Sequence, residues 1–241
     1  MLELGDKKIS ELYLGEKKVS EVYLGEKKIR PVGGYTVTNS TIFHWVGWTR
    51  DYWHNWKKKF KDVLQVTFNT NWWLARFETS TSCILPLDPI TFKENKGTIN
   101  LWYRYDRAAQ TWWWATLFWR NYGSYHHLLI QDWSGEIGFY NADSINFWNS
   151  WFRLSLWRWY NICITYENGN AKMYINWTFI SENSWMFNLT QQPIRSIGNY
   201  WYSEGYQWAI WLWGEVIIED WIWTDEQVEN RYNQTKQQFW L

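Results

Sequence analysis

Hydrophobic and polar residues alternate with a period of two in many short stretches of the chain. The clearest of these stretches are residues 64–68, 98–105, 127–131, 136–140, 161–166, 171–175 and 215–221. Period-two alternation is typical of strands, whose successive side chains point to opposite faces of a sheet. Because turn-forming residues separate these stretches, the pattern predicts an all-β sandwich.

One stretch, residues 224–236, has a helical pattern instead. It opens with Thr224, a residue type that caps helix N-termini, and it continues with Asp225 and Glu226. Acidic residues in the first turn interact favourably with the positive end of the helix dipole. We therefore predict one short helix near the C-terminal end of the sandwich.

Three ten-residue repeats, residues 2–11, 12–21 and 22–31, precede the strand-like region. Each reads apolar, any residue, Leu, Gly, acidic, Lys, Lys, apolar. Gly followed by an acidic residue favours a tight turn, so each repeat is predicted to form a strand, a turn and a strand. A proline and two glycines then end the pattern. The predicted division is a repeat segment at 1–32 and a sandwich at 33–241.

The repeats cannot bury a core alone, because about thirty residues of short hairpins enclose too little apolar surface. Their apolar positions are regularly spaced: Leu4, Ile9, Leu14, Val19, Leu24 and Ile29. We expect this apolar face to pack against sister chains in a homo-oligomer, with a trimer favoured. Folding back onto the main domain, or acting as a loose linker, are the alternatives.

The chain has 24 basic and 24 acidic side chains in 241 residues, so its net charge is zero. This balance does not favour nucleic acid or an anionic membrane as a partner. No apolar run approaches the roughly 18 residues that cross a bilayer, and the first residues lack the apolar core of a signal peptide. Cys83 and Cys163 are expected to be a buried free pair, with a single disulfide as the alternative.

Residues 159–176 carry a more specific pattern: Trp, two residues, alternating apolar residues, Thr-Tyr, a polar-Gly turn, then Lys-x-Tyr-apolar-Asn. This pattern resembles the central hairpin of laminin G-like, concanavalin A-like lectin domains. An early strand, the last long strand and the closing helix of those domains resemble, in order, residues 98–103, 214–220 and 223–233. The resemblance implies a jelly-roll sandwich with a binding role.

Tryptophan is unusually frequent, with 25 residues. The lectin pattern has Gly where this chain has Trp177, because an Asn-Gly turn needs positive φ at both central residues. Two explanations stay open: a surface that stacks on sugar rings, or UGA codons that the source reads as glycine. Further tryptophans stand at turn-like places: Trp133, Trp201, Trp211 and Trp213. Trp102 and Trp159, by contrast, stand where the lectin pattern itself has Trp.

The residues of one predicted strand, 215–219, disfavour a catalytic role. Glucanases of the same fold carry the pattern E-x-D-x-(x)-E, since two carboxylates must flank the glycosidic bond. Here Glu215 and Glu219 enclose Ile217, where the Asp should stand, and glutamates on a strand are usually solvated. No Ser-His-Asp order, P-loop or HExxH motif is present. We therefore expect a binding protein and not an enzyme.

Laminin G-like domains often bind Ca²⁺ at the sandwich rim through loop oxygens, which are hard ligands suited to this ion. The resemblance thus makes Ca²⁺ the cofactor to consider, with Asp132, Asp143 and Asn170 as candidate ligands and Asp106 as a further loop residue. Each of these residue types is also a common turn former, which is the alternative.

The ligand surface is expected on rim loops that are rich in Tyr and polar groups, residues 106–125 and 199–208. The candidate ligand-binding residues in them are Asp106, Tyr122, Tyr125, Tyr202 and Tyr206. The alternative is that these loops pack against a neighbouring subunit.

Residues 2–32 resemble the LGxKKV-type repeats at the N-termini of phage head fibres and tail-associated fibres, where they are thought to anchor and oligomerise the fibre. We therefore expect a phage virion fibre or decoration protein that is made in the host cytoplasm without a signal peptide. It would attach to a capsid or tail protein and bind a host-surface glycan or protein. A cellular surface adhesin or pilus-associated lectin module is the alternative, and a glycoside hydrolase is the disfavoured third hypothesis.

Overall fold

The computed structural model describes most of the chain. In the main region it covers residues 38, 40–46, 51–54, 56–64, 66–69, 74–77, 83–107, 115–119, 127–131, 134–140, 147–184, 190, 193–198 and 210–239, and before them six short strands between residues 2 and 29. The chain divides into two compact units, Met1–Thr36 and Val37–Leu241.

The first unit contains three antiparallel hairpins, one in each repeat, as the sequence predicts. Their strands are β1 (Leu2–Leu4) with β2 (Lys7–Ile9), β3 (Tyr13–Leu14) with β4 (Lys17–Lys18), and β5 (Val22–Leu24) with β6 (Lys27–Ile29). The same register recurs in the outer repeats, where Leu2 pairs with Ile9 and Val22 pairs with Ile29. Each hairpin is two-stranded, and an isolated two-stranded hairpin is only marginally stable in water.

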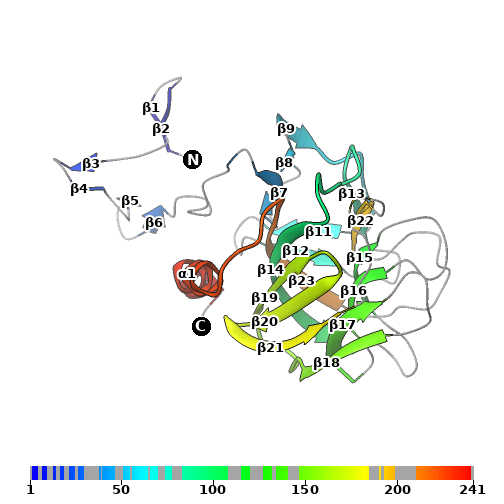
Figure 1. The fold of residues 1–241 in the computed structure, drawn as a ribbon. Helices are drawn as coiled ribbons and strands as arrows, with labels where there is room; N and C mark the ends of the chain where they lie inside the picture. Colours follow the sequence, from blue (N-terminus) through cyan, green and yellow to red (C-terminus); the bar gives the residue numbers. More distant parts are fainter. Residues whose placement is uncertain are drawn as a thin grey trace. The chain divides into compact units, whose positions relative to one another are not determined.

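The second unit is a sandwich of two antiparallel sheets, which confirms the predicted fold class (Figure 1). The larger sheet has the order β21 (Thr178–Asn183), β20 (Asn170–Ile175), β19 (Tyr160–Glu167), β14 (Lys96–Arg107), β23 (Ile210–Glu219), β7 (Thr41–Val46), β8 (Asp51–His54) and β9 (Trp56–Lys59). β12 (Leu74–Phe77) also pairs with β23, and β11 (Val66–Asn69) pairs with β12. The smaller sheet has the order β10 (Asp62–Leu64), β13 (Cys83–Leu85), β22 (Ser196–Gly198), β15 (Ala115–Trp119), β16 (His127–Gln131), β17 (Glu136–Tyr140) and β18 (Phe147–Arg153).

The core lies between the two sheets. Ile162 and Ile164 of β19 point into it, as their alternation predicts, and both are buried. The buried ring of Trp213 packs against the rings of Phe118 and Phe77, at centroid distances of 5.4 and 6.0 Å. Aromatic rings at such spacings contribute both buried area and favourable edge contacts. Trp213 therefore lies inside a strand, and the prediction that Trp211 and Trp213 mark a turn is wrong.

The two cysteines, Cys83 and Cys163, are buried and do not form a disulfide. Burial raises the pKa of the Cys163 thiol to about 12, because a thiolate loses its hydration inside the protein. The Cys163 thiol therefore stays protonated near neutral pH and packs as a small apolar side chain.

The predicted helix is present as α1 (Asp225–Thr235), followed by a short 3₁₀ turn, η1 (Lys236–Phe239). Thr224 accepts a hydrogen bond from the Gln227 backbone N–H, and the Gln227 side chain accepts one from the Thr224 N–H. This capping box satisfies two backbone donors that a helix N-terminus leaves unpaired. No helix in the described part of the chain is both long and apolar enough to span a bilayer.

α1 and η1 pack on the outer face of the larger sheet. The ring of Phe239 stacks on Trp102 of β14 with centroids 4.4 Å apart, and Trp102 donates a hydrogen bond from Nε1 to Oγ1 of Thr235. A side chain at Gly214 would collide with the Phe239 ring, so glycine is needed at this point of β23. The helix is thereby fixed above β14 and β23.

Candidate functional site

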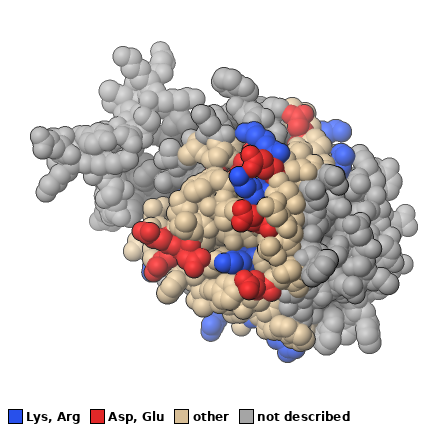
Figure 2. All heavy atoms as spheres, in the orientation of Figure 1, with Lys and Arg blue, Asp and Glu red and all other residues tan. Residues whose placement is uncertain are grey.

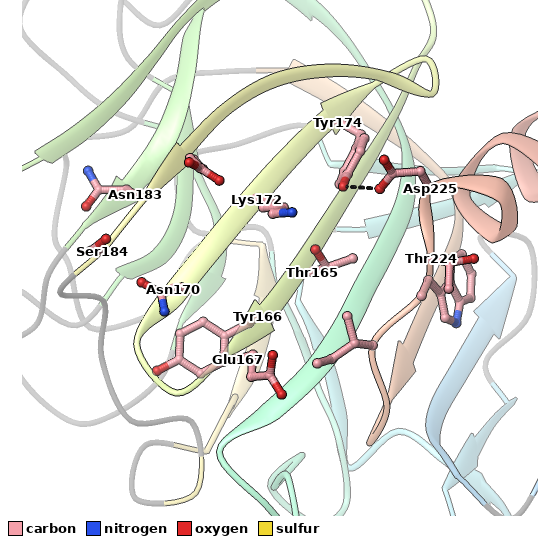
Figure 3. Close-up of a pocket in the computed structure, with 13 residues that line it drawn as sticks. Thr165, Tyr166, Glu167, Asn170, Lys172, Tyr174, Asn183, Ser184, Thr224 and Asp225 are labelled. Carbon is pink, nitrogen blue, oxygen red and sulfur yellow. Dashed lines mark hydrogen bonds between the residues drawn. The ribbon is translucent and has the colours of Figure 1, made fainter.

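A groove of about 780 Å³ lies on the outer face of the larger sheet, between β19, β20 and β21 on one side and the start of α1 on the other (Figure 3). Its lining consists of polar and aromatic side chains and one aliphatic side chain, Ile222: Thr165, Tyr166, Glu167, Asn170, Lys172, Tyr174, Glu182, Asn183, Ser184, Ile222, Trp223, Thr224 and Asp225. Period-two alternation explains part of this set, since Lys172 and Tyr174 of β20 point to the same face.

Tyr174 forms a hydrogen bond across the groove. Its hydroxyl donates a 2.7 Å hydrogen bond to Oδ1 of Asp225, which joins β20 to the first residue of α1. Burial of the phenol, and then the nearby Asp225 carboxylate, raise the pKa of Tyr174 above its ordinary value. The Tyr174 hydroxyl therefore remains a hydrogen-bond donor at neutral pH and holds Asp225 in one orientation.

An exposed aromatic ring lies beside this contact. Phe179 of β21 stands opposite Tyr174 of β20, and the two rings form an edge-to-face pair with centroids 5.8 Å apart. Phe179 is 50% exposed, whereas Tyr174 is buried. An accessible apolar ring therefore lies next to the Tyr174 side of the groove, although Phe179 is not one of the residues that line it.

The charge of the groove is predominantly acidic. Glu167, Glu182 and Asp225 supply carboxylates, and Lys172 supplies the one ammonium group among the lining residues. All four side chains belong to exposed residues, so they remain hydrated and available to a ligand. Such a surface accepts hydrogen bonds from hydroxyl groups and repels an anionic ligand. On the face shown in Figure 2, acidic and basic side chains alternate down the centre, and a further group of acidic side chains lies at the left.

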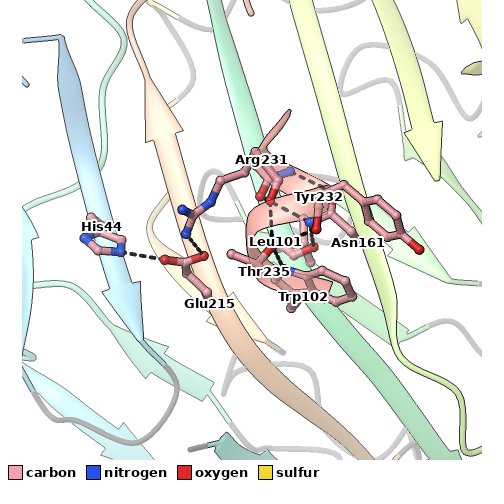
Figure 4. A network of polar contacts seen from close by, with 9 residues as sticks. His44, Leu101, Trp102, Asn161, Glu215, Arg231, Tyr232 and Thr235 are labelled. Carbon is pink, nitrogen blue, oxygen red and sulfur yellow. Dashed lines mark hydrogen bonds and ion pairs between the residues drawn. The ribbon is translucent and has the colours of Figure 1, made fainter. Parts of the chain in front are cut away.

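A buried ion cluster, defined by His44, Glu215 and Arg231, holds α1 on the sheet next to the groove (Figure 4). His44 Nε2 lies 2.9 Å from Glu215 Oε1, and Arg231 pairs with the other carboxylate oxygen. Burial opposes ionisation of Glu215, but the Arg231 charge and the His44 hydrogen bond outweigh it and lower the pKa of Glu215. The expectation that Glu215 is a solvated strand residue is wrong, because its carboxylate is needed to neutralise Arg231.

Glu219, the other glutamate of β23, is also buried, which again corrects the sequence-based expectation. Thr41 donates to its Oε1 at 2.7 Å, and Trp221 donates to its Oε2 at 2.9 Å. Burial nevertheless raises the pKa of Glu219 to about 7, because two neutral donors replace only part of the lost hydration.

Asp106, predicted as a loop residue of the ligand surface, lies instead in β14 and is buried. Its two carboxylate oxygens accept hydrogen bonds from Nε and Nη2 of Arg104, at 2.8 and 2.9 Å. The prediction that Asp106 lies in a rim loop is therefore wrong, and its bidentate pair with Arg104 gives it a structural role. A role of Asp106 in ligand binding stays a prediction.

The other predicted residues divide into two groups. Asn170 lies at the start of β20, is exposed, and lines the groove. Six lie outside the described residues: Tyr122, Tyr125, Asp132, Asp143, Tyr202 and Tyr206. Within the described part of the chain, no group of three or more His, Cys, Asp or Glu side chains is arranged to hold a metal ion. Binding of Ca²⁺ stays a prediction.

The sequence analysis missed the central groove residues Lys172, Tyr174 and Asp225. A signal for the first two was present, since the Lys-x-Tyr spacing places both on one face of a strand. Asp225 was noticed only as a helix-capping residue. Its contact with Tyr174 joins positions 51 residues apart and follows from the packing of α1 on the sheet.

Comparison with known proteins finds solved structures of similar fold but no matching sequence family. No family model matches the sequence, and no curated protein matches it. A Trypanosoma rangeli sialidase in complex with sialic acid is similar in structure, with a TM-score of 0.59, 11% identity, and coverage of 83% of this chain and 34% of the sialidase. The binding domain of botulinum neurotoxin serotype D/C has a TM-score of 0.58 at 15% identity, covering 81% of this chain and 52% of that domain.

The receptor-binding domain of botulinum neurotoxin type G is similar to the same degree, with a TM-score of 0.58, 15% identity, and coverage of 81% of this chain and 51% of that one. This chain thus spans between a third and about half of the length of these structures. At such identities the likeness shows the fold alone, and it confirms a lectin-like β-sandwich.

The comparisons also correct the expectation that the chain is not an enzyme. That expectation rested on a lectin-like fold without the glucanase pattern at Glu215 and Glu219. Solved sialidases, which are enzymes, align with 83% of this chain. A fold that hosts both enzymes and binding domains gives no ground for excluding catalysis.

Proposed function

We propose that this chain is a phage virion fibre or decoration protein whose lectin-like domain binds a host-surface glycan in the groove between β20, β21 and α1. The observation that carries the proposal is the combination of an exposed Phe179 ring with oriented polar groups at Tyr174 and Asp225. Sugars present the matching surface, since each ring has an apolar face and a rim of hydroxyl groups.

In the proposed complex, a sugar ring stacks on Phe179 while its hydroxyls reach the polar lining. Asp225 and Glu182 accept hydrogen bonds from hydroxyls, and Lys172 donates one. A ligand without negative charge is favoured, because the lining has three carboxylates against one ammonium group. The proposed ligand is therefore an uncharged, hydroxyl-rich glycan of the host surface.

The virion part of the proposal is supported by the N-terminal repeats, which form one hairpin each and resemble the repeats of phage fibres. Their marginal size favours association with sister chains through residues 2–32. The proposed assembly is a trimer, and the same segment would attach the fibre to a capsid or tail protein. Solved proteins of the same fold include a complex with sialic acid and a receptor-binding domain, which supports a glycan or receptor as ligand.

A glycan array probed with the full chain tests the groove. We expect binding to uncharged oligosaccharides and weaker binding to sialylated ones. Asp225→Asn and Lys172→Ala should each weaken binding about tenfold, as expected when one charge-assisted hydrogen bond is lost. The matched control Glu229→Gln, which removes a charge from an exposed part of α1 outside the groove, should leave binding unchanged. Groove variants that bind like the unsubstituted chain would contradict the proposal.

Light scattering of the full chain tests the assembly. We expect a trimer, and we expect Leu4→Glu, Leu14→Glu and Leu24→Glu together to yield a monomer, because charges replace the apolar face of the repeats. A monomeric unsubstituted chain would refute oligomerisation through this segment. Mass spectrometry of purified phage particles tests the location directly, and absence of the protein from particles would leave the cellular adhesin as the better hypothesis.

A further inference from the structure

Two consecutive hairpins of the larger sheet have loops of the same length and backbone shape. Glu167 pairs with Asn170, so the β19–β20 loop has two residues, Asn168 and Gly169, with φ of 47° and 92°. Ile175 pairs with Thr178, so the β20–β21 loop also has two residues. A two-residue loop with positive φ at both positions is the type I′ turn, for which Asn-Gly is the preferred sequence.

The second of these loops departs from that preference. Its residues are Asn176 and Trp177, with φ of 50° and 66°. A side chain with a Cβ is strained at such φ values, and only Gly, Asn and Asp adopt them routinely. Trp177 therefore occupies a backbone conformation suited to glycine, in a loop whose neighbour has glycine at the equivalent position.

Two more tryptophans share this conformation. Among the described residues, the non-glycine residues with positive φ are Asn168, Asn176, Trp151, Trp157 and Trp177. The two asparagines belong to the type that tolerates this region. All three remaining residues are tryptophan, although tryptophan makes up only 25 of the 241 residues. Because the remaining residues with positive φ are all tryptophan, we look for one cause that explains all three.

The local settings of the two additional tryptophans are also those of glycine. Trp151, with φ of 62°, lies in β18 at a bulge: Glu136 pairs with Arg153 and Gly138 with Asn149, so β18 has extra residues there. A β-bulge commonly places Gly in the left-handed conformation. Trp157, with φ of 65°, lies in the turn between β18 and β19. A turn that requires positive φ normally has Gly or Asn.

Burial does not compensate for the strain. Trp151, Trp157 and Trp177 are 79%, 64% and 46% exposed. Trp102 is different in each respect: it is fully buried, its Nε1 donates to Thr235, and its ring stacks on Phe239. Trp102 is thus a tryptophan that the fold uses, whereas Trp151, Trp157 and Trp177 are exposed and occupy backbone conformations suited to glycine.

We infer that positions 151, 157 and 177 are glycine in the protein as it is made in its natural source, encoded by UGA codons that are read there as glycine. Translation of UGA as tryptophan converts glycine into tryptophan at such codons and into no other residue. This single cause accounts for the residue type, the backbone conformation and the exposure of all three. It also removes the three exposed indoles as candidates for a sugar-stacking surface, and it is independent of the groove.

The codons of the gene test the inference directly. We expect UGA at positions 151, 157 and 177 and UGG at position 102. Peptides from the protein isolated from its natural source should contain glycine at the three positions. UGG at these three codons, or tryptophan in those peptides, would overturn the inference.

Thermal unfolding of the chain as printed offers a second test. Trp151→Gly, Trp157→Gly and Trp177→Gly should each raise Tm by roughly 2–4 °C, because each removes strain in the left-handed region. The control Trp102→Gly should lower Tm or prevent folding, because it empties a packed position. A lower Tm for all three exposed variants would show that the indoles stabilise the fold and would refute the inference.

Discussion

The helix α1 contacts the larger sheet through two polar clusters that differ in their access to water. The buried ion cluster (His44, Glu215 and Arg231) lies beneath the helix, and Glu215 and Arg231 are each 4% exposed. The groove edge, defined by Lys172, Tyr174 and Asp225, lies at the helix N-terminus, and its two charged residues are exposed.

This difference in solvation separates stability from binding. An unpaired charge in the buried cluster has no water to replace its lost partner, so the cluster tolerates little change. The charged groups of the groove edge are hydrated, so they can exchange water for a ligand at low cost to the fold. We therefore expect substitutions in the first cluster to affect folding, and substitutions in the second to affect ligand binding.

The largest expected effect follows loss of one member of the buried pair. Arg231→Leu should lower the free energy of unfolding by about 3–5 kcal/mol, because it leaves the Glu215 carboxylate buried and unneutralised. Denaturant unfolding measures this loss. The double variant Arg231→Leu with Glu215→Leu should recover much of the stability, since it removes both charges. A double variant less stable than Arg231→Leu alone would contradict this account.

The next largest expected effect is a change of the free energy of unfolding with pH. The two glutamates of β23 contribute to this change in opposite directions. Glu219 has a folded pKa of about 7, above its ordinary value of 4.5, so the folded state binds the proton more tightly. Its stabilising contribution is present below pH 4.5 and is lost as pH rises through 7. Glu215 has a lowered pKa, so its contribution is present above its ordinary pKa and is lost as pH falls.

Urea unfolding between pH 5 and 8 measures the Glu219 contribution. We expect the free energy of unfolding to fall by about 2 kcal/mol over this range, since a pKa unit corresponds to 1.4 kcal/mol and solvent screening reduces the sum. Glu219→Gln should flatten the profile, because the amide does not titrate. A profile that is unchanged in Glu219→Gln would assign the pH dependence to other groups.

A smaller effect is expected at the groove edge. Tyr174→Phe removes the hydrogen bond to Asp225 and should lower the free energy of unfolding by about 1 kcal/mol. Its effect on glycan affinity should exceed its effect on folding, because Asp225 loses its fixed orientation. Tyr232→Phe, on the α1 face that stacks on Trp102, is the matched control and should keep full affinity. Equal affinity of Tyr174→Phe and the unsubstituted chain would refute a role for the contact in binding.

The smallest effect on stability is expected for an exposed groove carboxylate. Glu182→Lys should change the free energy of unfolding by less than about 0.5 kcal/mol, as is usual for exposed positions. It should raise the affinity for sialylated glycans relative to uncharged ones, because it reverses a charge in the lining. Glu229→Lys, on α1 outside the groove, makes the same charge change and should not alter this preference.

The outcome of the sequence analysis depended on the range of the interactions involved. The strands of the 159–176 hairpin, the capped helix after Thr224 and the three N-terminal hairpins were predicted, because neighbours within a few residues determine them. Asp106 was misplaced because β14 continues to Arg107 through its pairing with the distant strand β23, beyond the stretch that the alternation predicted. The burial of Glu215 and Glu219 was missed because it depends on contacts from other parts of the chain. Glu215 pairs with Arg231 of α1, and Glu219 accepts hydrogen bonds from Thr41 of β7 and from Trp221.

By itself, the sequence determined the period-two strands, the turns and the helix cap, which follow from local conformational preferences, and the order of elements was implied by the resemblance to lectin domains. Only the tertiary structure decided which polar residues lie together. Tyr174 and Asp225 come from different elements, as do His44, Glu215 and Arg231. Contacts of this kind depend on how the helix and the sheet pack, and packing is a property of the whole fold, which no local pattern encodes.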